Sequence, residues 1–383
     1  MLKRGVRLAK WEIQHKNVTI GRVLGQGAFG EVRKGTLLRR SGRSVPVAVK
    51  TVRLISFQYV ILPEASHFRD FQSFNCMGKS WKDCLEATTM KPYAIHDGIL
   101  QLKSDTELSK AKIKEMMKEA RLMRELKHPN VVCIYGVALL EHPLYIILEY
   151  VPGGALDAYL RKNRHTIDRD ERLLMAMGAA WGMEYLHKSN VLHRDVAARN
   201  CLYDNDKIVK ISDFGLSRRG TTYKMQTAKK MPIKWMAPES MSNFTFSQKT
   251  DVYSYGVLVF EIFSGLEPYE GVSNSLTKKM ELLQILEGHL NQFPEGTPSK
   301  LVEFVKEKMW DKDPDNRLDM TQIVDWLERY TGLALDMPDD SVVGDVKDGE
   351  QPEPRKAQAV NTRHSQPRAR KRPPERQEQT KKN

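Results

Sequence analysis

Apolar and polar positions alternate near the start of the chain and take a helical period further along. Residues 18–52 alternate, and glycines interrupt the pattern between 25 and 30. Because successive side chains of a strand point to opposite faces, this stretch predicts strands over 18–20, 31–35 and 45–52, joined by turns.

The next segment, residues 110–127, places apolar side chains three and four positions apart. That spacing predicts an amphipathic helix, and His128-Pro129 predicts its end because proline cannot continue it. Two strand-like runs follow, over 131–138 and 144–150. The helices predicted after residue 153 cover 173–187, 251–263, 276–286, 301–310 and 320–330.

A small β-rich unit therefore precedes a larger helical unit, with the boundary near Val151, which is typical of the α+β class. The 383 residues, 40% of them hydrophobic, suffice for two or three domain-sized units with a sizeable core. The sequence contains no run of eighteen apolar residues, and its basic start is not followed by an apolar segment. We therefore expect a cytoplasmic protein, with its four scattered cysteines reduced.

The net charge of +13 is uneven along the chain. Residues 351–383 carry ten Lys or Arg against three Glu, whereas residues 335–350 carry six acidic residues against one Lys. Few large apolar side chains occur there, so residues 334–383 are predicted to be a disordered charged tail. The basic cluster at 368–372 is either solvated charge or a contact for an acidic partner, RNA, an import receptor or the anionic lipid at the inner face of the plasma membrane. No sequence-specific nucleic acid is expected as a partner.

The run Gly25-Gln26-Gly27-Ala28-Phe29-Gly30 lets the backbone approach phosphate oxygens. A dinucleotide-binding fingerprint would need a helix directly after the third glycine, but a strand containing Val32 follows. A plain hairpin is the other alternative. A β-branched run then ends in a lysine, Val47-Ala48-Val49-Lys50. Its distance along the chain from the glycine-rich run suits pairing of Lys50 with the α- and β-phosphates of a nucleotide.

A lysine aimed at phosphates needs an anion to hold its flexible stem. Glu119, on the polar side of the predicted helix, is the candidate. The alternative is a surface carboxylate paired with Arg121 or Lys118. Its spacing of four residues from Met123, which is expected to pack inward, favours the pair with Lys50.

Three later motifs have the order that phosphoryl transfer from ATP requires: His193-Arg194-Asp195, then Asn200, then Asp213-Phe214-Gly215. Asp195 is expected to accept the proton of the substrate hydroxyl, and Asn200 and Asp213 to bind Mg²⁺. Arg194 is expected to bind a regulatory phosphate. Singly, Asp195 fits a helix cap and Asn200 a turn, but the combination with Ala237-Pro238-Glu239 downstream favours catalysis.

From about residue 18 to 333 these motifs resemble the protein kinase family, and two features resemble its tyrosine-specific branch. Ala197 stands where serine/threonine kinases place a lysine, and Arg199 comes two positions later, which leaves more room for a phenol ring. Pro232-Ile233-Lys234-Trp235 is similar to the platform that supports the residue after the acceptor tyrosine.

The resemblance implies a bilobal protein kinase fold of the α+β class. The small β-rich N-lobe, with one key helix, would cover 18–150, and the large, mainly helical C-lobe would cover 151–333. Trp11-Glu12-Ile13 makes the chain similar to Fer/Fes-type non-receptor tyrosine kinases. In that family the tryptophan follows a Src-homology-2 domain, so residues 1–17 are interpreted as a linker remnant without that domain.

The resemblance also implies ATP, Mg²⁺ and protein substrates bearing tyrosine as cofactors and partners. Arg199 and the Lys50–Glu119 pair would assist catalysis by Asp195. The adenine would lie among the apolar side chains of Leu24, Val32, Ala48 and Leu202. The hinge beside it would be Glu149, Tyr150 and Val151. The gatekeeper residue behind it would be Leu148. A spine of the active state, or else plain core, is formed by Met123, Ile134, His193 and Phe214 above Asp251.

Tyr223 lies nine residues before Pro232, the offset of an activation-loop tyrosine in similar kinases. Its phosphate would pair with Arg194 and order the loop. Glu239 and Arg317 are expected to form a buried structural ion pair.

The connection between Lys50 and Glu119 is much longer than in the family, which marks residues 54–103 as an atypical insert. Two interpretations stay open: an exposed excursion that binds a partner and, slightly preferred, translated sequence from an unspliced intron. Loop closure costs only about 0.6 kcal/mol per doubling of length, so the pair can still form. A silent pseudokinase scaffold is disfavoured because Lys50, Asp195 and Asp213 are all present.

Overall fold

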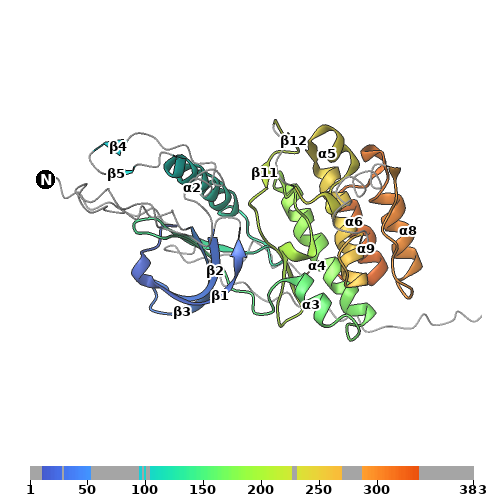
Figure 1. The fold of residues 1–383 in the computed structure, drawn as a ribbon. Helices are drawn as coiled ribbons and strands as arrows, with labels where there is room; N and C mark the ends of the chain where they lie inside the picture. The colour runs from blue at the N-terminus through green and yellow to red at the C-terminus, as the bar shows by residue number, and fades with distance from the viewer. Residues whose placement is uncertain are drawn as a thin grey trace, which may run out of the picture.

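The computed structural model describes residues 11–27, 30–52, 95–96, 99–100, 104–226, 231–269 and 287–335. They form an antiparallel sheet with a long helix beside it, followed by a mainly helical unit (Figure 1). The predicted α+β class, with a small β-rich lobe and a larger helical lobe, is confirmed.

The N-lobe contains a five-stranded antiparallel sheet in the order β1-β2-β3-β7-β6. Its strands are β1 (Val18–Gly27), β2 (Gly30–Leu38), β3 (Ser44–Val52), β6 (Ile134–Ala138) and β7 (Leu144–Glu149). β1 and β2 are longer than the alternation predicts, because ladder pairing continues into the glycine-rich run as far as Gly27 and Gly30. A separate hairpin of β4 (Ile95–His96) and β5 (Ile99–Leu100) lies within the predicted insert.

Helix α2 (Ser104–Met123) lies beside the sheet (Figure 1). It begins before the predicted residue 110 because its first turn, Ser-Asp-Thr-Glu, is polar and carries no apolar period. It ends before the predicted residue 127 because the backbone tightens ahead of Pro129, where the Leu126 amide donates to the Met123 carbonyl at 3.0 Å.

The C-lobe helices are α3 (Leu156–Lys162), α4 (Arg169–Lys188), α5 (Pro238–Asn243), α6 (Gln248–Ser264), α8 (Ser299–Lys308) and α9 (Met320–Thr331). Four of the predicted helices are confirmed with slightly different bounds, and the one predicted over 276–286 lies outside the described residues. The sequence missed α3 and α5 because six or seven residues are too few to show a period. Helix α4 packs against α6 and α9, and nearly all of α6 is buried.

Short strands position the segments between these helices. They are β8 (Val191–Leu192), β9 (Cys201–Tyr203), β10 (Val209–Ile211), β11 (Arg218–Arg219), β12 (Thr222–Lys224) and β13 (Thr245–Ser247), paired as β9-β10, β8-β11 and β12-β13. Single 3₁₀ turns cover η1 (His15–Asn17), η3 (Ala198–Asn200), η4 (Ile233–Trp235) and η5 (Pro314–Asn316).

The two lobes are tied by backbone and side-chain contacts. The Val132 amide donates to Ile211 at 2.9 Å, and the Ile211 amide donates to Asn130 at 2.8 Å. Close by, Lys210 Nζ lies 3.0 Å from Glu149 Oε1. These contacts join the turn after α2 and the end of β7 to the β9-β10 hairpin, which sets the position of the sheet on the helical lobe.

Residues ahead of β1 also join the sheet. The Ile13 amide donates to the Val137 carbonyl at 2.8 Å, the Val137 amide donates to Trp11 at 3.1 Å, and the Arg124 guanidinium lies 5.3 Å from the Trp11 ring centre. This part of the predicted linker remnant therefore packs on the N-lobe.

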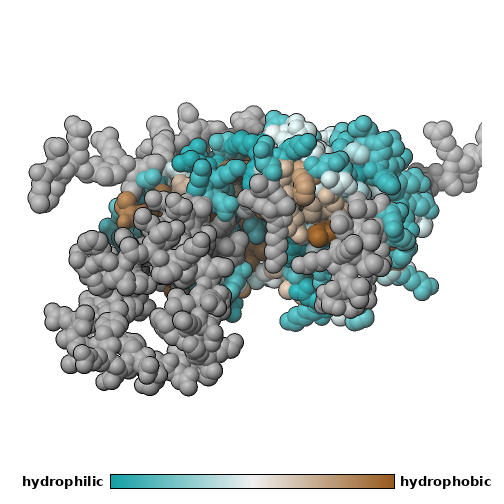
Figure 2. Space-filling view, turned by 45° about the horizontal axis from the view of Figure 1, so that its top comes forward, coloured by the Kyte–Doolittle hydropathy of each residue, from teal (hydrophilic) through white to brown (hydrophobic). Residues whose placement is uncertain are grey.

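Hydrophilic residues cover most of the visible helical lobe, and a smaller hydrophobic area is exposed near the middle of the view (Figure 2). Among the residues that the structure describes, no helix combines the length and the apolar character that membrane crossing needs. The predicted bounds of the insert and of the tail stay predictions, because most of both segments lies outside the described residues.

Candidate active site

Lys50 on β3 and Glu119 on α2 form a buried ion pair. Lys50 Nζ lies 2.8 Å from Glu119 Oε1 and 3.0 Å from Oε2, and the two side chains are 6% and 3% exposed. Burial raises the pKa of the Glu119 carboxyl, and the Lys50 charge opposes that shift. The predicted pair therefore forms across the insert, but Glu119 lies on the inner face of α2 rather than on its polar side.

Asp195, Arg199 and Asn200 meet in the segment between β8 and β9. The Asn200 side-chain amide donates to the Asp195 carbonyl at 2.8 Å, and the Arg199 guanidinium pairs with the Asp195 carboxylate. The Asp195 amide donates to His193 Nδ1 at 3.3 Å. These contacts fix the direction of the Asp195 carboxylate, which is 17% exposed and therefore accessible at one edge.

Asp213 lies next to this segment because the Ser212 amide donates to the Asn200 carbonyl at 2.8 Å. The Asp213 side chain is 47% exposed, and its Oδ1 lies 3.8 Å from Lys50 Nζ. Its backbone has a φ of 56°, a left-handed conformation that is uncommon outside glycine and turns the carboxylate toward Lys50. Asp213, Asn200 and Lys50 are thus gathered between the lobes.

The donor set suits Mg²⁺, which prefers a few carboxylate or amide oxygens and completes its shell with water and phosphate oxygens. Asn200 commits its amide nitrogen to Asp195, which leaves the amide oxygen as its ligand atom. The described residues contain no cluster of three His, Cys, Asp or Glu side chains that could hold a metal ion alone. The other ligands of Mg²⁺ at this position would be water and phosphate oxygens.

The glycine-rich hairpin covers the same region from the sheet side. Gly27 pairs with Gly30, while Ala28 and Phe29 lie outside the described residues. A Cβ at Gly30 would lie 2.1 Å from the Thr51 carbonyl oxygen, so only glycine fits there, whereas a Cβ at Gly25 would meet nothing within 4 Å. Gly30 is therefore required by packing against β3, a reason that the phosphate interpretation did not include.

The residues expected around adenine lie on facing elements. Ala48 on β3 is opposite Leu148 on β7, and the Leu202 backbone on β9 bridges to Ala155 just after the hinge. Val151 and Ala48 are buried, Val32 and Leu202 are half-buried and Leu24 is exposed, while Gln26 pairs with Glu31 in the hairpin. These positions are compatible with a planar base held between the lobes.

The Glu149 side chain has a contact that the sequence did not predict. Its side chain pairs with Lys210, and its Oε2 accepts from the Cys133 amide at 3.2 Å. The carboxylate is therefore committed to the lobe junction, and only the backbone of this hinge residue remains for a nucleotide.

The spine residues are all buried: Met123, Ile134, His193 and Phe214. The His193 and Phe214 rings meet edge to face, with centroids 5.3 Å apart. Below them, the two Asp251 carboxylate oxygens accept from the backbone amides of His193 and Arg194, each at 2.8 Å. These contacts fit both alternatives, a spine of the active state and plain core, so the spine stays a prediction.

Arg194 and Tyr223 are brought together. The Arg194 guanidinium lies 4.4 Å from the centre of the Tyr223 ring and 4.1 Å from that of Phe246, which pairs with Tyr223 across β12-β13. Its Nε is buried and has no hydrogen-bond partner among the described residues. Burial lowers the pKa of Arg194 to about 10, and the Arg218 charge adds to the effect. Two cations therefore surround this tyrosine.

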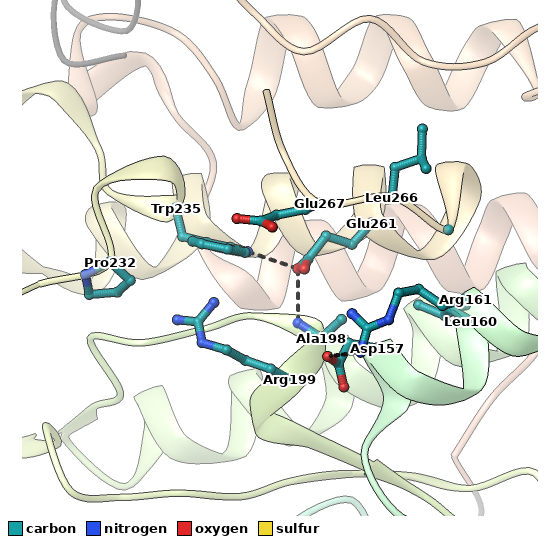
Figure 3. Close-up of a pocket in the computed structure, with 11 residues that line it drawn as sticks. Asp157, Leu160, Arg161, Ala198, Arg199, Pro232, Trp235, Glu261, Leu266 and Glu267 are labelled. Atoms are coloured by element: carbon teal, nitrogen blue, oxygen red, sulfur yellow. Dashed lines mark hydrogen bonds and ion pairs between the residues drawn. The ribbon is translucent and has the colours of Figure 1, made fainter. Parts of the chain in front are cut away.

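The sequence did not point to one residue of this region, Glu261 on α6. Its Oε2 accepts from the Ala198 amide at 2.8 Å and from Trp235 Nε1 at 2.9 Å (Figure 3). The available signal was a glutamate within the apolar run Val-Leu-Val-Phe-Glu-Ile-Phe, since buried carboxylates occur rarely without a partner. Further down the lobe, Arg317 forms the predicted pair with Glu239, at 2.7 and 2.9 Å.

Comparison with known proteins places this geometry in a family. The family model of protein tyrosine and serine/threonine kinases matches residues 94–327. The chain is 34% identical over 323 residues to Fer-related kinase 1 of Caenorhabditis elegans, which covers 84% of this chain and 68% of that protein.

Two further relatives are tyrosine-protein kinases. Tyrosine-protein kinase ABL2 of Homo sapiens is 43% identical over 231 residues, which is 59% of this chain and 19% of that protein. Tyrosine-protein kinase Fer of Rattus norvegicus is 33% identical over 311 residues, which is 80% of this chain and 30% of that protein. The chain thus spans less than a third of the length of these two relatives. It belongs to the protein tyrosine kinase family, as a member similar to the non-receptor kinases of the Fer and Abl types.

Proposed function

We propose that this chain is an active kinase that transfers the γ-phosphoryl group of ATP to tyrosine hydroxyls of protein substrates. The observation that carries the proposal is the simultaneous presence of the Lys50–Glu119 ion pair and of Asp195, Asn200 and Asp213 beside it. A pseudokinase scaffold would need none of these contacts.

In this proposal each residue has one role. Lys50, held by Glu119, binds the α- and β-phosphates, and the glycine-rich hairpin covers them. Mg²⁺, bound by Asn200, Asp213 and phosphate oxygens, would neutralise the charge on the transferred group. The phenolic oxygen bonds to the γ-phosphorus, the bond from that phosphorus to the β–γ bridging oxygen breaks, and ADP leaves. Asp195 orients the phenol and accepts its proton.

The preference for tyrosine is supported by the place of Arg199. Its guanidinium pairs with Asp195 and lies 4.0 Å from the centre of the Trp235 ring. The positive charge beside Asp195 therefore lies next to the Pro232–Trp235 platform. Ala197 leaves the position beside Asp195 without a long side chain, and an aromatic ring then fits where a lysine would otherwise stand.

We also propose that phosphorylation of Tyr223 activates the enzyme. Arg194 and Arg218 already lie over the ring, and the buried Arg194 Nε offers a further donor. A phosphate adds about two negative charges and accepts charge-assisted hydrogen bonds, so it would draw both guanidinium groups onto the loop. The cytoplasmic location and the contact of the tail with an anionic membrane stay predictions.

Phosphate transfer from radiolabelled ATP to a tyrosine-containing polymer tests the function. We expect transfer by the purified full chain and a loss of about a thousandfold or more in Asp195→Asn, with unchanged binding of MgATP. Binding of MgATP without any transfer, and equally a failure to bind MgATP, would contradict the proposed activity and favour the scaffold.

A further inference from the structure

A cavity of about 340 Å³ lies next to the proposed catalytic segment, between α3, the Ala198-Arg199 turn, the Pro232–Trp235 platform and the end of α6 (Figure 3). Glu261 reaches into it from α6, and the other polar residues of its wall come from different elements. Asp157 on α3 pairs with Arg161 at 2.9 Å, and Glu267 pairs with Lys234 at 3.1 Å.

Glu261 differs from these carboxylates because its two hydrogen bonds are with neutral N–H groups. One oxygen accepts both from the Ala198 amide and from Trp235 Nε1. The residue is only 5% exposed, and burial raises the pKa of its carboxyl to about 7. A buried carboxylate of this kind is costly for stability, and an apolar residue of similar volume would avoid that cost.

The contacts continue from Glu261 to the proposed proton acceptor. The Trp235 ring, held by its Nε1 bond to Glu261, lies against the Arg199 guanidinium at 4.0 Å, and Arg199 pairs with Asp195. The Ala198 amide, also held by Glu261, is the backbone immediately before Arg199. Both sides of Arg199 are therefore fixed by the same oxygen.

We propose that Glu261 is a positioning residue, whose carboxylate holds Ala198 and Trp235 so that Arg199 keeps the Asp195 carboxylate in its productive orientation. It acts through these residues. The inference rests on the proposed kinase function and extends it, because it makes the peptide platform and the catalytic segment one mechanically connected unit.

Substitutions at Glu261 separate positioning from mere packing. Glu261→Gln keeps an oxygen that accepts both hydrogen bonds, whereas Glu261→Met fills a similar volume without an acceptor. Asp157→Asn is the matched control, since it changes a carboxylate to an amide in the same cavity without touching Ala198 or Trp235. For each variant, kcat and KM with the tyrosine polymer, the Kd of MgATP and the thermal midpoint are measured.

We expect kcat to fall by about tenfold to a hundredfold in Glu261→Met and to remain within about threefold of the wild type in Glu261→Gln and Asp157→Asn. The Kd of MgATP is expected to stay the same in all variants, because the two hydrogen bonds of Glu261 are with Ala198 and Trp235, which are not among the proposed ligands of MgATP. If Glu261 only filled space, the methionine and glutamine variants would have similar kcat values. A higher kcat in the glutamine variant therefore distinguishes positioning from packing.

Three results would overturn the inference. The first is a methionine variant as active as the glutamine variant. The second is a glutamine variant that loses as much kcat as the methionine variant. The third is a loss of MgATP binding equal to the loss in kcat. Inactivity of the wild type with MgATP bound would instead contradict the proposed function, and the role of Glu261 would fail with it.

Discussion

At the residue scale, the site holds its buried carboxylates in two ways. Glu119 faces a lysine, while Glu261 faces two neutral N–H groups. The first arrangement keeps a charge that the proposed chemistry uses directly. The second fixes a geometry, and the two residues should therefore respond differently to the same change from carboxylate to amide.

Glu119→Gln should weaken the hold on Lys50 and lower kcat/KM by about tenfold to a hundredfold, because a neutral amide replaces the carboxylate of the ion pair. Steady-state kinetics at several ATP concentrations measure the change. Glu115→Gln, one turn earlier on the exposed side of α2, is the control and should retain wild-type rates. Equal rates in both variants would contradict the role of the Lys50–Glu119 pair.

Glu261 should make stability depend on pH. Its folded-state pKa is raised from 4.5 to about 7 by burial, with Arg199 lowering it and Asp157 raising it. The folded protein binds this proton more tightly, so the contribution is fully present below pH 4.5 and is lost as the pH rises through 7. Relative to Glu261→Gln, the wild type should lose about 3 kcal/mol of unfolding free energy between pH 4 and pH 8.

Urea unfolding of both proteins at the two pH values measures this difference. Comparing the two proteins removes the contribution of all other titrating groups that they share. A gap between wild type and variant that is the same at both pH values would show that Glu261 titrates normally.

Tyr223→Phe should lower activity without abolishing MgATP binding, because the phosphate that would gather Arg194 and Arg218 cannot form. The rates of both proteins are compared after incubation with ATP, and mass spectrometry locates the phosphate. Tyr330→Phe, on α9 and away from this loop, is the control. Identical kinetics for Tyr223→Phe and the wild type would exclude activation through this residue.

At the element scale, α4 is held against the β9-β10 hairpin by a close approach at Gly182. A Cβ there would lie 2.6 Å from the Asn130 carbonyl oxygen and 2.8 Å from Ile211 Cγ1. Alanine ordinarily favours a helix over glycine by about 1 kcal/mol. Here Gly182→Ala should instead destabilise the protein by about 1 to 3 kcal/mol, because the lobe junction must shift.

Chemical denaturation of Gly182→Ala and Gly178→Ala tests this. The second variant is a matched control one turn earlier, where the nearest atom to a new Cβ would be Asn130 Nδ2 at 3.1 Å, so its effect should be smaller. A stabilised Gly182→Ala would mean that helix propensity outweighs packing at this junction.

Elements with a sustained period were the predictable ones. The apolar alternation of residues 45–52 and the helices α4, α6, α8 and α9 appear close to the expected bounds. The short strands β8 to β13 were not predicted, because two or three residues carry no period. Of these, β8 and β10 lie against α4 and β13 lies against α6, and such packing depends on distant parts of the chain.

The same division applies to the site. Lys50, Asp195, Asn200 and Asp213 could be predicted as site residues because their spacing is tied to one chemistry. The commitment of Glu149 to Lys210 and the double contact of Glu261 were not predicted, because each depends on which distant backbone packs beside the carboxylate.

At the scale of the whole molecule, the pair of Arg317 and Glu239 connects the start of α5 with the segment before α9. The Arg317 side chain is fully buried, and its Nε also donates to the Asp311 carbonyl at 2.8 Å. Glu239→Gln should therefore cost about 3 to 5 kcal/mol of unfolding free energy, since it leaves a buried charge without its partner.

Unfolding in guanidinium chloride measures this loss. Glu303→Gln, an exposed carboxylate on α8, is the control and should change stability by less than about 0.5 kcal/mol. A Glu239→Gln protein as stable as the control would mean that Arg317 finds an equivalent acceptor.

Helix α6 grips the active segment at two places. Asp251, in its first turn, binds the amides of His193 and Arg194, and Glu261, near its end, binds that of Ala198. Ten residues of helix separate these anchors by about 15 Å. The catalytic segment is therefore attached at both of its ends to the same helix. Any event that unwinds the middle of α6 would loosen both attachments together. Enzymatic activity and the folding of this buried helix should therefore be lost in a single transition.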